Sequence, residues 1–169
     1  RSEQELRALA GMGYQCATVD VSDRFGNYGI VGLLIWRESN SSLEVDTFLL
    51  SCRALGRGVE HRMLAFLAAG AIEHGLDAVT VRIAPTAKNL PARQFMREVA
   101  DQYRRPDGNG PVLEYTLPPD RFRDLRWQPA TEVLRQLPDV MYLRGGLGET
   151  TYLSPNPRVP LSGTLVVDG

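Results

Sequence analysis

The sequence predicts an α/β domain whose central sheet is mixed, with parallel and antiparallel strand pairs. Residues 43–51, 59–74 and 77–84 read in turn as a strand, a helix and a strand, an order that makes the two strands a parallel pair. Residues 15–36 contain two further strand-like runs joined by a turn, which indicates an antiparallel hairpin. With 169 residues, 43% of them hydrophobic, the chain is long enough to bury one core without disulfides or metal.

The first elements are a short helix and the hairpin. Residues 2–11 place Ser2 as an N-cap and Glu5 three positions later, which is the capping-box pattern at the start of a helix. Residues 15–22 alternate apolar and polar side chains, and the run 30–36 is nearly all apolar. We therefore expect two antiparallel strands here, joined by a turn.

A third strand and the main helix follow. Residues 43–51 are rich in β-forming apolar residues. From Val59 to His74 the apolar residues recur at helical spacing, whereas Glu60 and Arg62 lie off this stripe. Gly75 is suited to end the helix.

The predicted domain closes with a strand, a helix and a strand. Residues 77–84 alternate as a strand does, and Pro91 suits the first turn of a second helix that opens at Asn89. Residues 112–117 form the closing strand. The second helix carries an apolar stripe that we interpret as a core face: Ala92, Phe95, Met96 and Val99.

The remainder of the chain differs in texture. Residues 118–169 are rich in Pro and Gly, apart from a short amphipathic stretch at 131–137. We therefore divide the chain into a domain at 1–117 and an irregular tail or interdomain connector at 118–169. Because the chain begins at Arg1 and ends within a strand-like run, we expect it to be a piece of a longer protein.

Charge and composition argue against several classes of function. The 19 Lys and Arg residues are balanced by 20 Asp and Glu residues, so there is no basic field for nucleic acid. The apolar run 30–36 is far shorter than the roughly 20 residues of a membrane-spanning helix, and no signal pattern precedes it. Two cysteines without a Cys/His cluster favour a reducing compartment and no metal. We expect a cytoplasmic protein.

A glycine loop lies between the third strand and the main helix. Gly56 and Gly58 directly precede the helix, so unpaired backbone N–H groups converge there, a geometry that binds phosphate. Arg53 and Arg57 would add charge-assisted contacts. A tight strand-to-helix turn needs glycines for structural reasons too, so both interpretations stay open.

Two motifs add a family resemblance. Arg53-x-x-Gly56-x-Gly58 resembles the acyl-coenzyme A pyrophosphate loop of the GCN5-related N-acetyltransferase (GNAT) fold, and Asn89-x-x-Ala92-x-x-Phe95 resembles its second helix motif. The resemblance implies a GNAT-like mixed sheet with helices on both faces, here without the first strand and helix of the complete fold. It also implies a coenzyme A or phosphopantetheine thioester held by Arg53, Leu55, Gly56, Arg57, Gly58, Val59 and Asn89.

Three longer segments narrow the resemblance. Residues 23–32, 46–60 and 85–89 look like the C-terminal GNAT-like half of the FkbH-like family. That likeness implies a partner HAD-like half, an acyl carrier protein, and transfer of a glyceryl or other acyl group in polyketide-type biosynthesis. No HAD phosphatase motif occurs in this chain.

The second helix departs from the GNAT pattern, because Met96 stands where many of these enzymes have a proton-donating Tyr. Two alternatives therefore stay open. One is a non-catalytic module that binds a carrier protein, and the other is a small-molecule N-acetyltransferase.

Four residues are candidates for catalysis. Cys52 lies at the strand end beside the helix N-terminus, a setting that favours a thiolate able to form a thioester. Glu44 and Asp46, on the preceding strand, are candidates for a general base. His61, in the first turn of the main helix, is the histidine placed to reach Cys52.

Overall fold

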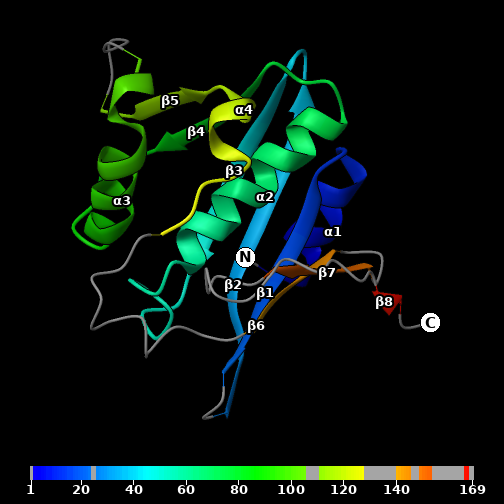
Figure 1. Cartoon of the computed structure of the whole chain (residues 1–169). Coiled ribbons are helices and arrows are strands. Elements are labelled where there is room, and N and C mark those ends of the chain that lie inside the picture. Colours follow the sequence, from blue (N-terminus) through cyan, green and yellow to red (C-terminus); the bar gives the residue numbers. More distant parts are fainter. Residues whose placement is uncertain are drawn as a thin grey trace.

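The computed structural model describes residues 2–23, 26–105, 111–127, 140–145, 149–153 and 166–167. Within these residues, helices and strands follow one another in an order that begins as predicted and continues beyond residue 117 (Figure 1). The elements are α1 (Glu3–Gly11), β1 (Gln15–Asp23), β2 (Gly26–Ser39), β3 (Ser42–Leu50), α2 (Val59–Glu73), β4 (Ala78–Ile83), α3 (Leu90–Ala100), the 3₁₀ turn η1 (Asp101–Tyr103), β5 (Leu113–Leu117), α4 (Pro119–Phe122), β6 (Val140–Gly145), β7 (Glu149–Leu153) and β8 (Val166–Val167).

The described strands form one mixed sheet in the order β5-β4-β3-β2-β1-β6-β7-β8. β3 and β4 are parallel and are connected through α2, whereas the pairs β1–β2, β2–β3 and β4–β5 are antiparallel. The predicted mixed α/β architecture is therefore confirmed. The hairpin is longer than the sequence suggested, because β1 and β2 stay paired as far as Asp23 and Gly26.

Three short segments of the chain after residue 117, which the sequence analysis assigned to a tail or interdomain connector, pair with the sheet. β6 lies antiparallel to β1, from Ala17 opposite Gly145 to Ser22 opposite Val140, and β7 and β8 add outside it. The physical reason is that β1 would otherwise present an unpaired edge. The amphipathic stretch at 131–137 lies outside the described residues.

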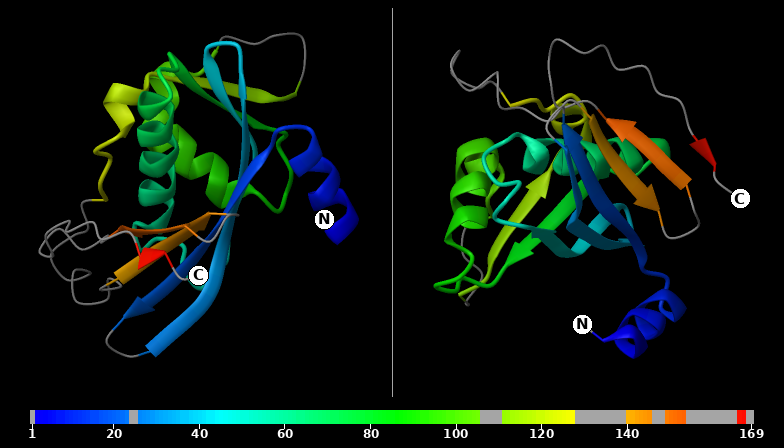
Figure 2. Two further views of the ribbon diagram at one scale, coloured as in Figure 1. Left: turned by 90° about the vertical axis from the view of Figure 1, so that its right-hand side faces the viewer. Right: turned by 90° about the horizontal axis from the view of Figure 1, so that it is seen from below.

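Helices lie on both sides of the sheet, as expected. The two views of Figure 2 place α1 and α2 on opposite sides of the strands. The capping box of α1 is present: the Ser2 hydroxyl accepts from the Glu5 N–H, and the Glu5 carboxylate accepts from the Ser2 N–H. Of the residues of α1, Leu9 is buried. None of the described helices is long and apolar enough to cross a membrane.

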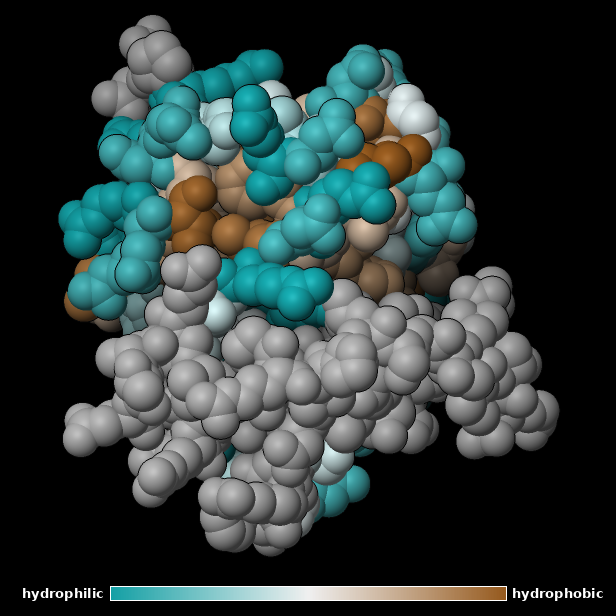
Figure 3. Space-filling view, viewed as in Figure 1, coloured by the Kyte–Doolittle hydropathy of each residue, from teal (hydrophilic) through white to brown (hydrophobic). Residues whose placement is uncertain are grey.

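The main core lies between the sheet and α2. Its members come from β1 to β5, α2, α3 and α4, and α2 contributes an apolar row that is fully buried: Val59, Met63, Leu64, Leu67, Ala68 and Ala71. On the molecular surface seen in Figure 3, from the same side as in Figure 1, polar side chains surround smaller apolar areas.

The first two turns of α2 differ from the sequence expectation. Glu60 and Arg62, which the helical pattern placed off the apolar stripe, are buried together with His61. α4 packs along α2, Phe95 of α3 contacts His61, and Trp127 contacts Gly58. A helix packed on a sheet leaves the side that faces away from the sheet exposed to solvent. In α2, the contacts with α3, α4 and Trp127 bury that side.

Candidate functional site

A cleft opens where the two parallel strands separate. β3 and β4 pair only from Ser42 opposite Ala78 to Val45 opposite Val81, although β3 continues to Leu50. β3 also carries a β-bulge at this point, because Ile35 of β2 lies opposite Thr47 and Trp36 opposite Val45, so that Asp46 has no counterpart on β2. A bulge bends its strand and leaves the extra residue outside the ladder. The bulge and the separation of the strands therefore coincide.

The cleft has a volume of about 730 Å³ and is bounded by the free end of β3, the end of β4, the first turn of α2 and the inner side of α3. Its wall is mixed: Phe48, Phe95 and Met96 supply apolar surface, while other residues supply charge. The charged or titratable lining residues are Asp46, Glu60, His61, Arg82, Lys88 and Glu98.

The glycine loop closes one end of the cleft. Gly56 and Gly58 have φ values of +71° and +79°, a left-handed conformation that glycine adopts without a steric penalty. Gly58 is the N-cap of α2, and no side chain caps that end. The Gly56 N–H is used within the chain, because it donates to Oε1 of Glu60 at 3.1 Å.

Trp127 covers the same loop. A Cβ built on Gly58 would lie 2.9 Å from Cβ of Trp127 and 3.1 Å from its Cε3. The space that the missing side chain leaves open at Gly58 is therefore filled by Trp127, which also lines the cleft.

Burial shifts the pKa values of two neighbouring groups in opposite directions. The pKa of Glu60 is raised, chiefly because burial disfavours its charged form, and hydrogen bonds from its own N–H and that of Gly56 counteract this. Burial lowers the pKa of His61, an effect that the nearby Glu98 partly offsets. At neutral pH His61 is therefore an uncharged imidazole able to accept a proton.

His61 is held by aromatic contacts. The ring of Phe95 meets it edge to face at a centroid distance of 5.0 Å, and Phe95 in turn stacks on Phe48 of β3 at 6.4 Å. Nδ1 of His61 and Oε2 of Glu60 are buried and have no hydrogen-bond partner among the described residues. A bound molecule in the cleft is a source of such partners.

The structure brings some of the predicted site residues to the cleft and leaves others elsewhere. Asp46, Leu55, Gly56, His61 and Asn89 line it.

The remaining loop residues do not line the cleft. Cys52 and Arg53 are exposed, and Val59 is fully buried in the core. Arg57 turns toward the hairpin, where it donates to the Tyr28 hydroxyl at 3.2 Å and lies over the Tyr28 ring. His61 lines the cleft and Cys52 does not, so the cleft does not bring these two side chains together as expected.

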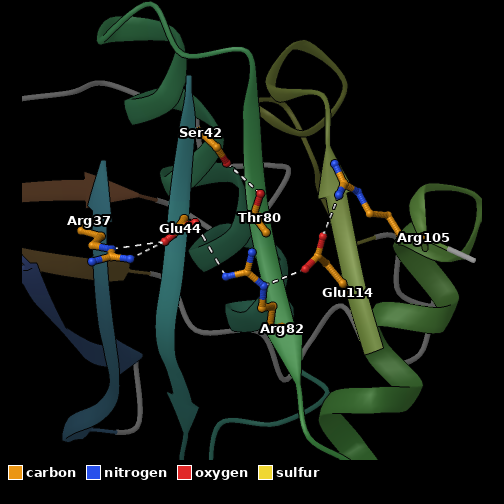
Figure 4. A network of polar contacts seen from close by, with 7 residues as sticks. All are labelled: Arg37, Ser42, Glu44, Thr80, Arg82, Arg105 and Glu114. Atoms are coloured by element: carbon orange, nitrogen blue, oxygen red, sulfur yellow. Dashed lines mark hydrogen bonds and ion pairs between the residues drawn. The ribbon is translucent and has the colours of Figure 1, made fainter. Parts of the chain in front are cut away.

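Glu44 belongs to a row of ion pairs that crosses β2, β3, β4 and β5 (Figure 4). Its carboxylate binds Arg37 at 2.9 Å and Arg82 at 3.7 Å, and Arg82 binds Glu114 at 2.7 Å. Arg105 continues the row to Glu114 at 3.2 Å. Glu44 does not line the cleft, and this arrangement gives it a structural place in the sheet.

Asn89 organises the loop before α3. Its side-chain oxygen accepts from the Thr86 N–H at 2.9 Å and its amide donates to the Ala84 carbonyl at 2.8 Å. It occupies the N-cap position of α3 but makes no capping hydrogen bond to that helix.

Sequence reasoning missed Glu60, Glu98 and Trp127 as parts of the site. Glu60 carried a usable signal, because it lies two residues after Gly58, within the first helical turn. Trp127 carried none, because its contact with Gly58 spans 69 residues of chain and depends on how α4 packs. Among the described residues, no group of three or more His, Cys, Asp or Glu side chains is arranged to hold a metal ion.

Solved structures with a similar fold were found. A protein from Desulfovibrio desulfuricans assigned to the GNAT family of acetyltransferases has a TM-score of 0.51 and 14% identity, over 69% of this chain and 78% of that chain. A chimera of the Vibrio cholerae spermidine N-acetyltransferase has a TM-score of 0.47 and 17% identity, over 72% of this chain and 79% of that chain. No family model and no curated protein matches. The chain has a GNAT-like fold, as the motifs predicted.

Proposed function

We propose that the chain is an acyltransferase that holds the pantetheine arm of a thioester in the cleft between β3 and β4. The observation that carries this proposal is the coincidence of three features: the separation of the parallel strands, the bulge at Asp46 and the cleft of about 730 Å³. Extended backbone outside the ladder offers N–H and C=O groups to an extended amide-containing arm.

The proposed reaction needs a group that accepts a proton. An amine or hydroxyl of the acceptor attacks the thioester carbonyl carbon, the carbon–sulfur bond breaks, and the thiolate leaves and takes up, through water, the proton that the acceptor has passed to His61. His61 receives the proton that the acceptor loses, because its buried imidazole is uncharged at neutral pH. Asp46, at the bulge, attracts a cationic acceptor.

The finer assignment follows the resemblance to the FkbH-like family. We propose that the acyl group is carried on an acyl carrier protein and that a HAD-like half acts with this domain. The likeness of residues 46–60 to that family supports the assignment. Cys52 as the site of a covalent thioester stays a prediction, and the exposed position of Cys52 gives it no contact with the cleft.

Titration calorimetry with S-acetylpantetheine tests the proposed cleft. Ala92 lines the cleft on α3, so Ala92→Trp should fill it and abolish binding. Ala69→Trp is the matched control, because Ala69 is exposed on α2 away from the cleft. Binding that survives Ala92→Trp, in a variant whose circular dichroism is unchanged, would place the ligand elsewhere.

Catalysis is tested by release of free thiol from S-acetylpantetheine with an amine acceptor. His61→Gln should lower this rate about a hundredfold or more, the usual contribution of a positioned base, and leave binding of the thioester intact. Cys52→Ser tests the predicted thioester at Cys52, and an unchanged rate would refute it. If the thioester binds tightly but no acceptor gains an acyl group, the chain is a non-catalytic binding module, which the presence of Met96 in place of a proton donor favours.

A further inference from the structure

The glycine loop of this chain is already occupied by groups of the chain itself. Phosphate binds at such a loop by accepting from its backbone N–H groups and by approaching the space above the glycines. Here the Gly56 N–H donates to Glu60, and Trp127 fills the space above Gly58.

Glu60 is also placed to act by charge. Its side chain lines the cleft and is about nine-tenths buried, with one oxygen on the loop and the other without a partner in the described part of the chain. A diphosphate at the loop would lie within a few ångströms of this carboxylate in a poorly solvated place, where like charges repel strongly. The neighbouring Glu98 on α3 adds to that repulsion.

The arginines that the motif provides do not line the cleft, where Lys88 is the lysine present. Arg53 is exposed and lies outside the cleft, and Arg57 contacts Tyr28. The cleft itself continues past the loop toward Phe48, Phe95 and Met96, so a pantetheine arm has apolar wall to contact without reaching the loop.

We infer that Glu60, together with Trp127, is a specificity-determining residue that closes the glycine loop to diphosphate, so that the cleft takes thioesters by their pantetheine arm and gains nothing from an adenosine diphosphate. This inference rests on the proposed function. It sets the chain apart from the acyl-coenzyme A pyrophosphate loop that the motif resembles.

The test compares two probes on the same protein, S-acetylpantetheine and acetyl-coenzyme A, by titration calorimetry. The wild-type chain should bind both within about threefold of one another, because the diphosphate adds no contact. Glu60→Gln keeps the size and the acceptor oxygen but removes the charge, so it should strengthen acetyl-coenzyme A binding about tenfold or more and leave S-acetylpantetheine unchanged. Glu73→Gln, an equal change at the exposed far end of α2, should alter neither.

A second variant guards against a folding defect in the first. Trp127→Ala opens the space above Gly58 and should raise the ratio of acetyl-coenzyme A affinity to S-acetylpantetheine affinity, whatever it does to either alone. Inorganic pyrophosphate should compete with acetyl-coenzyme A in Glu60→Gln but not in the wild type.

The outcomes separate the two proposals. If neither probe binds the wild type, the proposed function fails. If the wild type binds acetyl-coenzyme A ten or more times tighter than S-acetylpantetheine, or if neither folded variant changes the ratio, the loop is open to diphosphate and the inference about Glu60 is overturned.

Discussion

Replacing Phe95 by Ala should loosen the cleft and move the titration of His61. The ring of Phe95 contacts both His61 of α2 and Phe48 of β3. Among the described residues, no other aromatic ring links α2 to β3 in this way. Removing the ring deletes both contacts and admits water to the imidazole. His61 then loses the main cause of its lowered pKa, which is burial.

The size of the effect follows from these two contacts. Each aromatic contact contributes about 0.5 to 1.5 kcal/mol beyond area burial, and truncation of a fully buried Phe costs about 3 to 5 kcal/mol. Because Phe95 is only partly buried, we expect the free energy of unfolding to fall by about 2 to 4 kcal/mol. The pKa of His61 should rise toward its ordinary value of 6.5.

Proton NMR is suited to this measurement, because the chain has only two histidines. In the wild type the His61 imidazole should titrate below 6.5. The only other histidine, His74, is exposed at the far end of α2 and paired with Glu38, so the two imidazole signals can be told apart by a His74→Gln variant. An unchanged His61 pKa in a folded Phe95→Ala variant would refute the assignment of its shift to burial beneath Phe95.

The lowered pKa of His61 contributes to the pH dependence of stability. Between the folded-state pKa of His61 and the unfolded value of 6.5, this imidazole binds more protons in the unfolded state, so its contribution to stability rises with pH through that window and is lost as pH falls through it. The raised pKa of Glu60 contributes with the opposite sign above 4.5, so the contribution of His61 is read from the difference between the wild type and Phe95→Ala. Urea denaturation at several pH values should show this dependence in the wild type and a weaker one in Phe95→Ala. An equal dependence in both proteins would contradict the argument.

Three further predictions concern the loop, the sheet and the first helix. Gly56→Ala and Gly58→Ala each force an alanine into a left-handed conformation, which costs about 1 to 2 kcal/mol. Only the Cβ at position 58 meets Trp127, so thermal denaturation should show Gly58→Ala to be the less stable variant. Equal losses of stability would contradict a role for the Trp127 contact. Glu44→Gln breaks two ion pairs of the partly solvated row, so the free energy of unfolding should fall by about 1 kcal/mol or less, and by less at high salt. The rate of thiol release should stay at the wild-type value. A large fall in that rate would support Glu44 as the general base. Ser2→Ala removes the N-cap of α1 and should lower the free energy of unfolding in urea by about 1 kcal/mol or less. An unchanged midpoint of the urea transition would show that α1 unfolds independently of the domain.

Local features of the sequence predicted most of the elements. The capping box at Ser2, the alternation in β1 and the helical spacing from Val59 each depend on residues only a few positions apart, so they can be identified without tertiary information. The glycine loop was predictable for the same reason, because Gly56 and Gly58 directly precede α2.

The sheet beyond β5 and the interior of the site were not predictable in this way. β6 follows a Pro-rich segment and gains its regular structure from the edge of β1, far away in sequence. Glu60 and Arg62 have polar side chains, so any pattern of hydrophobicity assigns them to the surface, yet contacts from α3, α4 and Trp127 cover that side of α2.

The sequence by itself determined the order of strands and helices as far as β5, the parallel crossover and the place of the loop, because hydrophobic period and glycine conformation act over one or two turns of chain. Only the tertiary structure decided that β3 parts from β4 at the bulge, that His61 and not Cys52 lines the resulting cleft, and that Glu60 and Trp127 contact its glycine loop. These are contacts between segments distant in the chain, and they exist only once packing has brought those segments together.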